Sequence, residues 1–216
     1  MDFSTARKNM IASQIRPNKV TNEALLSSMA DAPRERFLPD ALRAVAYADE
    51  DMKLNAERSM MEPMVLARLL QELALTPGDA VLDIASGTGY AAAIMARLAA
   101  AVFAQESDAD LQGRAGELFG ELALDNVVSV DGDLAAGCAE HAPYNAILIE
   151  GAVDAVPAGI LDQLADGGRL IAIVMENGIG RVTLFRKDGD HLSRRVIFDA
   201  NVPVLKAFQN PEKFRF

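Results

Sequence analysis

The stretch that most constrains the fold runs from Val81 to Tyr90 and reads Val-Leu-Asp-Ile-Ala-Ser-Gly-Thr-Gly-Tyr. An apolar run typical of a buried parallel strand leads into a Gly-x-Gly turn, and the alanine-rich segment 91–100 then has helical spacing of its apolar residues. Such glycines let a ligand approach the backbone closely, and the first amides of the helix offer hydrogen-bond donors. This unit predicts a nucleotide-type site in an α/β fold. The alternative is an ordinary tight turn that Asp83 only caps.

Asp83 stands at the carboxyl end of the predicted strand and helps to choose the ligand. A dinucleotide would place its pyrophosphate against this turn, where a carboxylate would repel it. S-adenosylmethionine has no phosphate and carries an ammonium and a sulfonium group, so an acid suits it. The sequence therefore favours S-adenosylmethionine over a nicotinamide cofactor. The residues predicted to hold it along this stretch are Asp83, Ala85, Ser86, Gly87, Thr88 and Gly89.

Two further acids follow the next two predicted strands. Glu106 ends the apolar run 101–106, close to the spacing of roughly 20 residues at which α/β nucleotide folds place a carboxylate on ribose hydroxyls. Past the strand at 127–130, Asp133 is predicted to accept from the adenine amino group, with Gly132 in the turn and Leu134 packed on the ring. The alternatives are a solvated glutamate at a strand end and a plain Asp-Gly turn.

Composition restricts the class of protein. The chain has 216 residues, of which 50% are hydrophobic and 24% charged, which suits one α/β domain with an added segment. A net charge of −10 argues against a nucleic-acid partner. Cys138 is the only cysteine, and the two histidines, His141 and His191, are too few and too far apart in sequence to suggest a metal site. With no apolar leader and no run long enough to span a membrane, the chain is expected in the cytoplasm, without a membrane partner.

The order of elements predicts a doubly wound, mostly parallel Rossmann-like sheet that finishes antiparallel. We expect one domain in three parts: a helical, substrate-side segment (1–62), a cofactor-binding core (63–175), and an antiparallel hairpin with a tail (176–216). Residues 50–59 are expected to be irregular, and the tail 207–216 is expected to strap onto the body, with an oligomer contact as the alternative. The expected helices are 3–15, a short one opening at 21–24, one beginning at 61–64, 91–100, 108–123 and 157–165; the expected strands are 81–84, 101–106, 127–130, 145–150, 169–175, 182–185 and 192–198.

These motifs, in this order, resemble those of class I S-adenosylmethionine-dependent methyltransferases, and more closely those of the protein-L-isoaspartate O-methyltransferase family over nearly the whole chain. The resemblance is carried by Pro33-Arg34-Glu35-Arg36-Phe37-Leu38-Pro39, Ala46-Tyr47-Ala48-Asp49, Ser86-Gly87-Thr88-Gly89-Tyr90, Pro143-Tyr144, Ile160-Leu161-Asp162-Gln163-Leu164 and Gly167-Gly168-Arg169-Leu170. It implies methyl transfer to a carboxylate of an isoaspartyl protein or peptide. The oligomeric state is left open.

The chain departs from the family pattern beside the expected acceptor. The resemblance places hydroxyl residues before Pro63, but here Met61 stands at the family's serine position and only Ser59 keeps a hydroxyl, which makes Ser59 the candidate catalytic residue. Asn145 likewise takes a position usually given to Asp. Met61 and Glu62 would present an apolar wall and a negative charge to an anionic acceptor, unless Arg58 compensates. Two alternatives therefore stay open: the same scaffold and cofactor with another acceptor, and a homologue that binds the cofactor without catalysis.

Overall fold

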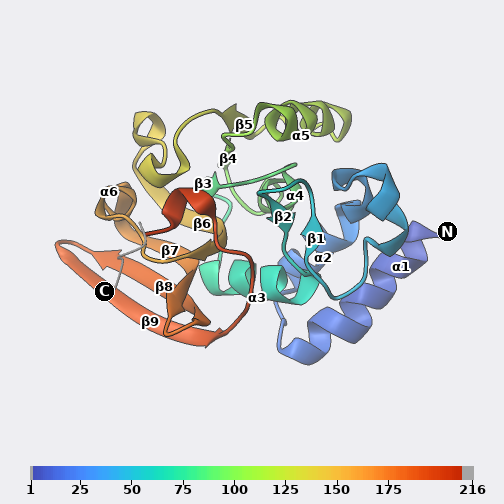
Figure 1. The fold of residues 1–216 in the computed structure, drawn as a ribbon, viewed down its shortest axis with the longest axis horizontal. Coiled ribbons are helices and arrows are strands. Elements are labelled where there is room, and N and C mark those ends of the chain that lie inside the picture. Colours follow the sequence, from blue (N-terminus) through green and yellow to red (C-terminus); the bar gives the residue numbers. More distant parts are fainter. Residues whose placement is uncertain (1, 211–216) are drawn as a thin grey trace, which may run out of the picture.

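The computed structural model describes residues 2–210 and is centred on one seven-stranded sheet (Figure 1). Its strands are β3 (Ala80–Ile84), β4 (Ala101–Gln105), β5 (Val127–Val130), β6 (Tyr144–Val153), β7 (Leu164–Glu176), β8 (Ile179–Asp188) and β9 (His191–Asp199). They lie in the order β5-β4-β3-β6-β7-β8-β9. The first five of these are parallel to one another, whereas β8 is antiparallel to both β7 and β9. The predicted fold class is confirmed.

The strand order reverses direction between β3 and β6, which lie side by side although β4 and β5 separate them in sequence. In open α/β sheets, ligands bind beyond the carboxyl ends of the strands at such a switch point. The end of β3 therefore lies where this topology favours a ligand site.

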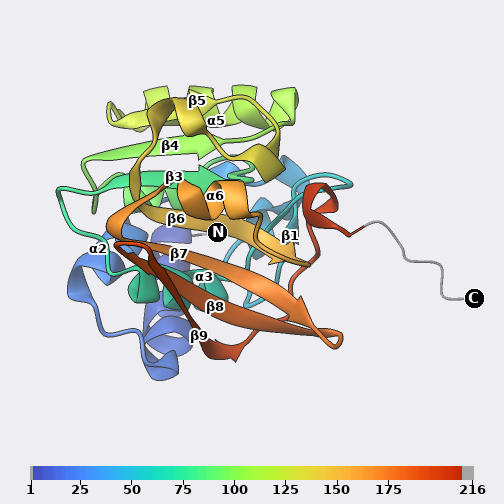
Figure 2. The same ribbon diagram turned by 90° about the vertical axis from the view of Figure 1, so that its left-hand side faces the viewer.

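Alternating residues of the buried strands feed two cores, one on each face of the sheet. Leu82, Ile84 and Ile147 belong to one cluster, and Val81 and Leu148 belong to the other. The helices are α1 (Phe3–Met10), α2 (Glu23–Asp31), α3 (Pro63–Leu73), α4 (Tyr90–Met95), α5 (Ala109–Glu121) and α6 (Ala158–Asp162). Figure 2 shows α6 in front of the sheet and α2 and α3 behind it. Because both faces are covered, the central strands are apolar almost throughout.

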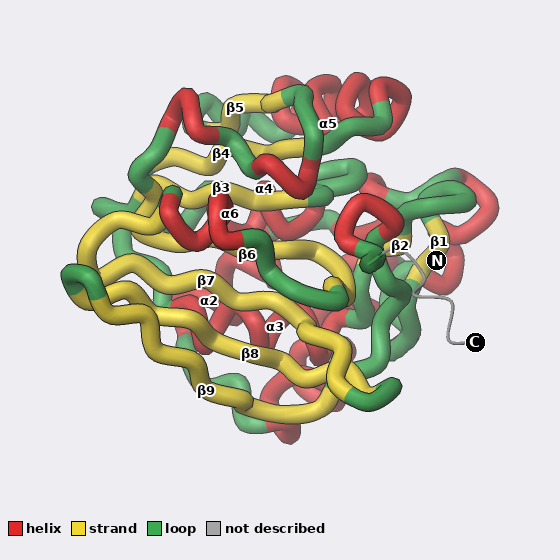
Figure 3. Tube along the Cα trace, turned by 60° about the vertical axis from the view of Figure 1, so that its left-hand side comes forward, coloured by secondary structure: helices red, strands yellow, loops and turns green. Residues whose placement is uncertain are grey.

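The segment before α3 supplies a small element that the sequence did not predict. Within the expected irregular run 50–59, β1 (Met52–Lys53) pairs with β2 (Ser59–Met60) in an antiparallel hairpin. Figure 3 shows this hairpin apart from the main sheet, at one end of it. Its tip, residues 54–58, reaches the glycine turn after β3, since Leu54 lies against Gly87.

Three predicted α-helices are shorter than expected. The one expected at 3–15 ends at Met10 and continues as a π-helix over Ile11–Ile15. The helix expected at 91–100 ends at Met95, because the Asn126 side-chain amide donates to the carbonyls of Ala96, Ala99 and Ala100 and holds that segment as turns. The helix expected at 157–165 ends at Asp162, where the Gln163 side chain donates to the carbonyls of Gly159 and Ala136 and accepts from the Cys138 amide, and β7 begins at Leu164.

At the carboxyl end, the last described residues return to β6. The amide of Leu205 donates to the Ala152 carbonyl (2.8 Å), and the amide of Ala152 donates to the Pro203 carbonyl (3.0 Å). Phe208 is buried in the second core. The part of the predicted strap from 211 to 216 lies outside the described residues. No helix within residues 2–210 has the length and hydropathy needed to cross a membrane.

Candidate active site

The three predicted acids lie at the carboxyl ends of three neighbouring strands. Asp83 is in β3, Glu106 follows β4 and Asp133 follows β5, so parallel pairing brings them to the same edge of the sheet. Asp83 and Glu106 are buried, whereas Asp133 is exposed. At this end of the sheet, the carboxyl groups of Asp83 and Glu106 are therefore enclosed, and that of Asp133 is open to solvent.

The turn between β3 and α4 depends on glycine at both motif positions. Gly87 has φ +55° and Gly89 has φ +87°, backbone conformations that L side chains rarely adopt. A Cβ on Gly89 would lie 2.4 Å from Phe119 Cζ, and one on Gly87 would lie 2.7 Å from Leu54 Cδ1. The Thr88 hydroxyl donates to the Phe37 carbonyl (2.6 Å), which fixes the turn to the Arg-x-x-Phe stretch.

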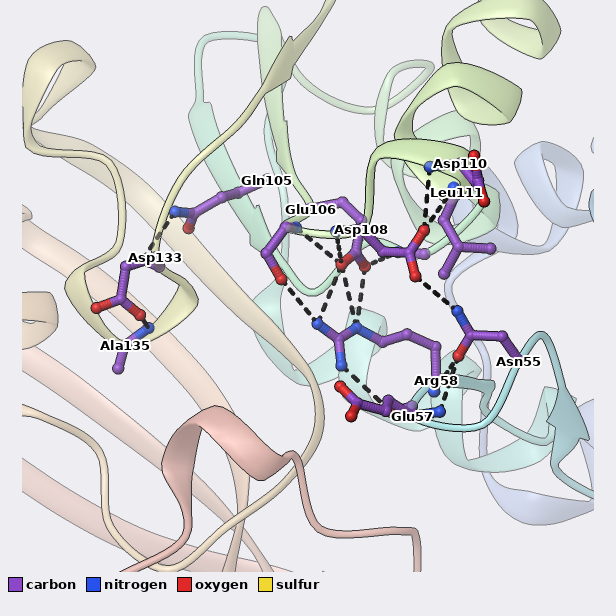
Figure 4. A network of polar contacts seen from close by, with 12 residues as sticks. Asn55, Glu57, Arg58, Gln105, Glu106, Asp108, Asp110, Leu111, Asp133 and Ala135 are labelled. Atoms are coloured by element: carbon purple, nitrogen blue, oxygen red, sulfur yellow. Dashed lines mark hydrogen bonds and ion pairs between the residues drawn. The ribbon is translucent and has the colours of Figure 1, made fainter.

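Glu106 is the centre of a dense hydrogen-bond network (Figure 4). Its carboxylate accepts from the amides of Gly87 (3.0 Å), Ser107 (2.8 Å) and Asp108 (3.0 Å). The Arg58 guanidinium donates to it as well, through Nε (3.1 and 3.2 Å) and Nη2 (3.0 Å). The predicted ribose acceptor is thus already paired with the chain's own arginine.

Arg58 is held in place by the tip of the β1–β2 hairpin. The Asn55 side-chain carbonyl accepts from the amides of Glu57 and Arg58 (both 2.8 Å), and its amide donates to Asp108 (2.8 Å). With Arg58 buried against Glu106, its guanidinium is committed to the cofactor side. It therefore does not offset the negative charge beside the acceptor, as the sequence had left open.

Asp83 forms a buried acid pair with Glu150 of β6. Both Asp83 oxygens and Oε1 of Glu150 are buried with no hydrogen-bond donor among the described residues. Burial and the nearby Glu106 carboxylate raise the pKa of Asp83 to about 8, and burial together with Asp83 raises the pKa of Glu150 well above its usual range. A cationic ligand would ionise such an acid, and a phosphate would gain nothing from it. The pair fits the ammonium and sulfonium charges of S-adenosylmethionine.

On the β5 side, the backbone is fixed but the carboxylate stays open. The Gln105 side-chain amide donates to the carbonyls of Asp133 (3.1 Å) and Gly137 (2.8 Å). Asp133 accepts the Ala135 amide (3.0 Å), and Leu134 is buried beside it. Gln105 was not singled out from the sequence. Its position as the last residue of an apolar strand is the signal that could have found it.

No group of three or more His, Cys, Asp and Glu side chains within residues 2–210 is arranged to hold a metal ion.

Comparison with known proteins identifies the family. The family profile Protein-L-isoaspartate(D-aspartate) O-methyltransferase matches residues 5–205. The chain belongs to this family. The predictions of a class I S-adenosylmethionine-dependent methyltransferase, and of this family in particular, are confirmed.

Relatives align along most of the chain. The protein-L-isoaspartate O-methyltransferase of Koribacter versatilis is 33% identical over 94% of this chain and 92% of its own length. That of Roseiflexus castenholzii is 34% identical over 95% and 94%. A solved protein-L-isoaspartate O-methyltransferase superposes with a TM-score of 0.80 at 25% identity, covering 92% of this chain and 65% of that one. A Plasmodium falciparum structure in complex with S-adenosyl-L-homocysteine shares the fold, with a TM-score of 0.80 at 18% identity, over 96% of this chain and 99% of that one.

Arg34 holds the backbone of residue 61, the position at which the family pattern has a serine. Arg34 is fully buried, and its guanidinium donates to the carbonyls of Ala46 and Met61 (both 2.8 Å) and lies over the Tyr90 ring. The Pro-Arg-Glu-Arg-Phe stretch that carries the resemblance thus positions residue 61 as well as the glycine turn. Asn145, the second departure from the family pattern, accepts the Ala80 amide (2.9 Å) and joins the starts of β3 and β6.

Met61, Ser59 and Glu150 line one small pocket on the acceptor side. Its far wall is the returning segment at Val202, Pro203 and Leu205, and Asp51 and Glu57 complete its rim. Lys206 pairs with Glu57 (3.0 Å) across the same rim. The structure thus brings the predicted Ser59 next to Glu150, which the sequence reasoning missed. An acid that closes an almost wholly apolar strand was the available signal.

Proposed function

We propose that this protein methylates the free carboxylate of isoaspartyl residues in peptides and proteins, with S-adenosylmethionine as the methyl donor. The observation that carries the proposal is the acid edge formed by Asp83 and Glu106, next to the pocket of Ser59 and Met61, in a chain of this family. The cofactor supplies a methyl group activated on a sulfonium sulfur. The cytoplasmic location expected from the single cysteine is part of the same proposal.

The residues of the chain divide the work between holding the donor and orienting the acceptor. Asp83 faces the positive charge of the cofactor, Glu106 accepts from ribose hydroxyls once Arg58 yields its place, and Asp133 lies on the adenine side. The backbone of Gly87 and Gly89 allows the close approach. These roles extend the sequence predictions for residues 83–89, 106 and 132–134.

A carboxylate acceptor needs no general base, because its pKa of about 4 leaves it ionised at neutral pH. Catalysis then consists of orientation and exclusion of water. The buried walls at Met61 and Leu205 exclude water, and the half-buried Ser59 supplies a hydroxyl at the pocket. The site has what this reaction requires of a protein.

The test uses two peptides that differ only in an isoaspartyl or a normal aspartyl linkage. We expect base-labile methyl ester on the isoaspartyl peptide alone, measured with labelled S-adenosylmethionine. Asp83→Asn serves as the disabled control. Methyl transfer to both peptides, or to neither, would contradict the proposal.

A second candidate function is favoured by one observation. Asp51, Glu57 and Glu150 surround Met61, so the pocket is acidic and partly apolar. A cationic acceptor such as a primary amine would suit this charge. Turnover of amine substrates without turnover of the isoaspartyl peptide would select this function, and cofactor binding with no turnover of either would indicate a non-catalytic homologue.

A further inference from the structure

Two small cavities meet at the end of β6, and they share two side chains. One lies on the cofactor side against the glycine turn, and the other lies on the acceptor side against Met61. Each has a volume of about 10 Å³, which is room for about one water molecule. Only Ser59 and Glu150 line both. These two side chains therefore stand where a methyl group would pass from donor to acceptor.

The backbone of β6 is irregular at this point. Its pairing with β7 jumps from Leu148↔Ile171 to Ala152↔Ile173, so β6 holds extra residues around Glu150. Bulges of this kind commonly re-aim a side chain beside an active site. Pairing with β3 ends at Ile149, one residue before Glu150. The strand thus leaves the regular ladder where it delivers this carboxyl.

Glu150 has an unused polar atom in this position. The residue is 6% exposed, and its Oε1 has no hydrogen-bond partner among the described residues. A buried oxygen without a hydrogen-bond partner lowers the stability of the fold, so its presence calls for an explanation such as a role in the site. The hydroxyl that the family pattern places at residue 61 is absent, because Met61 has no polar hydrogen to donate.

We infer that the Glu150 carboxyl donates the hydrogen bond that orients the acceptor carboxylate, in place of the hydroxyl lost at Met61. This inference rests on the proposed function. Glu150 keeps its proton throughout, because the acceptor oxygen forms the new bond to carbon with its own electron pair and the pair of the broken methyl–sulfur bond stays on sulfur. Glu150 is thereby an acceptor-binding residue and not a base.

The charges around Glu150 favour the protonated form. Burial raises its pKa most, and the acids Asp83 and Glu106 raise it further, while Arg34 opposes them. Asp51 and Glu57 line the acceptor pocket from the hairpin side. Burial likewise raises the pKa of the neighbouring Asp83 to about 8, so the pair holds at least one proton at neutral pH, and Glu150, which lines the acceptor cavity, is the member placed to donate it.

Two substitutions distinguish the effect of the Glu150 hydrogen-bond donor from the effect of the size of its side chain. Glu150→Ala removes the donor, and we expect kcat/KM for the isoaspartyl peptide to fall about 100-fold, the usual effect of losing one oriented donor. Glu150→Gln keeps an N–H donor of the same size and should lose less than about tenfold. Adding Met61→Ser to Glu150→Ala should restore at least about tenfold. Glu140→Gln, at an exposed acid that lines neither cavity, is the matched control and should change nothing.

Readouts other than turnover test the same contact. Calorimetry with the S-adenosylhomocysteine-loaded protein should show isoaspartyl peptide binding about tenfold weaker in Glu150→Ala, with S-adenosylhomocysteine affinity within about threefold of the parent. Peptide affinity of the parent should fall at high pH, where Glu150 ionises, and that of Glu150→Gln should not. The infrared difference between parent and Glu150→Gln at neutral pH should contain the carbonyl band of a protonated carboxylic acid.

Unchanged turnover and peptide affinity in Glu150→Ala would overturn this inference, and so would the absence of the protonated carboxyl band. A parent protein that binds S-adenosylhomocysteine but neither binds nor methylates the isoaspartyl peptide would instead refute the proposed function, and this role with it. The parent's own data therefore distinguish the two failures.

Discussion

Arg58 occupies the hydrogen-bonding positions of Glu106, the acid that we propose accepts from the ribose hydroxyls. Three guanidinium contacts of 3.0–3.2 Å join the two side chains, and both are almost fully buried. A cofactor that uses Glu106 must therefore compete with a side chain of the same molecule.

This competition predicts opposite effects of Arg58→Ala on the free and the loaded protein. Breaking a buried ion pair costs about 3 kcal/mol or more, so the melting temperature of the free protein should fall. The stabilisation by S-adenosylhomocysteine should increase, because the ligand no longer displaces an arginine. Arg16→Ala, which breaks an exposed pair with Glu23, is the control and should leave the melting temperature almost unchanged. Both are read from thermal melts with and without ligand; a smaller ligand effect in Arg58→Ala would mean that Arg58 binds the cofactor.

Gly89→Ala should damage both stability and cofactor binding. The new Cβ would overlap Phe119 in a backbone conformation with φ +87°, which we expect to cost about 1–3 kcal/mol. Gly113→Ala in α5 is the matched control, because a Cβ there meets nothing within 4 Å and alanine favours the helix by roughly 0.5–1 kcal/mol. Urea unfolding of the two variants should therefore move in opposite directions, and a neutral Gly89→Ala would contradict the strained turn.

Asp83 predicts how stability depends on pH. Its pKa is raised to about 8 by burial, well above the value of an unfolded chain, so the folded protein retains a proton that the unfolded chain releases. The free energy of unfolding is thus highest below about pH 4 for this group and falls as pH rises towards 8. Asp83→Asn should flatten this slope between pH 5 and about 8 in denaturant titrations. If the free energy of unfolding depends on pH with the same slope in the parent and the variant, the raised pKa does not belong to Asp83.

The hydroxyl of Thr88 should matter more than its size. It donates to the Phe37 carbonyl inside the protein, so Thr88→Val leaves a buried carbonyl unpaired at a cost of about 1–3 kcal/mol. Thr88→Ser keeps the donor and should retain most of that stability and the S-adenosylhomocysteine affinity, which Thr88→Val should lose. Equal melting temperatures for the two variants would argue against this contact.

Much of the architecture could be predicted because the strongest signals were local. The apolar strand before Gly87 and the alternating hairpin after Gly178 each follow from short-range pattern, and the structure has both. The paired strands of the β1–β2 hairpin could not be predicted, because two-residue strands leave no periodicity to detect.

The acids were harder to interpret than the fold. Glu106 was predicted as a free acceptor, but its partner Arg58 comes from a distant loop, and no local pattern indicates that contact. Glu150 was passed over because its importance arises from the opposing Asp83 and from a register shift in β6. Pairings between remote segments decide both cases, and a single sequence does not display them.

The wall at Pro203 and Leu205 has a consequence for synthesis. The glycine turn and the acids at 83 and 106 are translated in the first half of the chain, but the acceptor pocket closes only when residues 202–205 come back to Ala152. The acceptor pocket therefore stays open during synthesis until residues 202–205 have left the ribosome and paired with β6, although every residue that lines the cavity against the glycine turn precedes them in the chain.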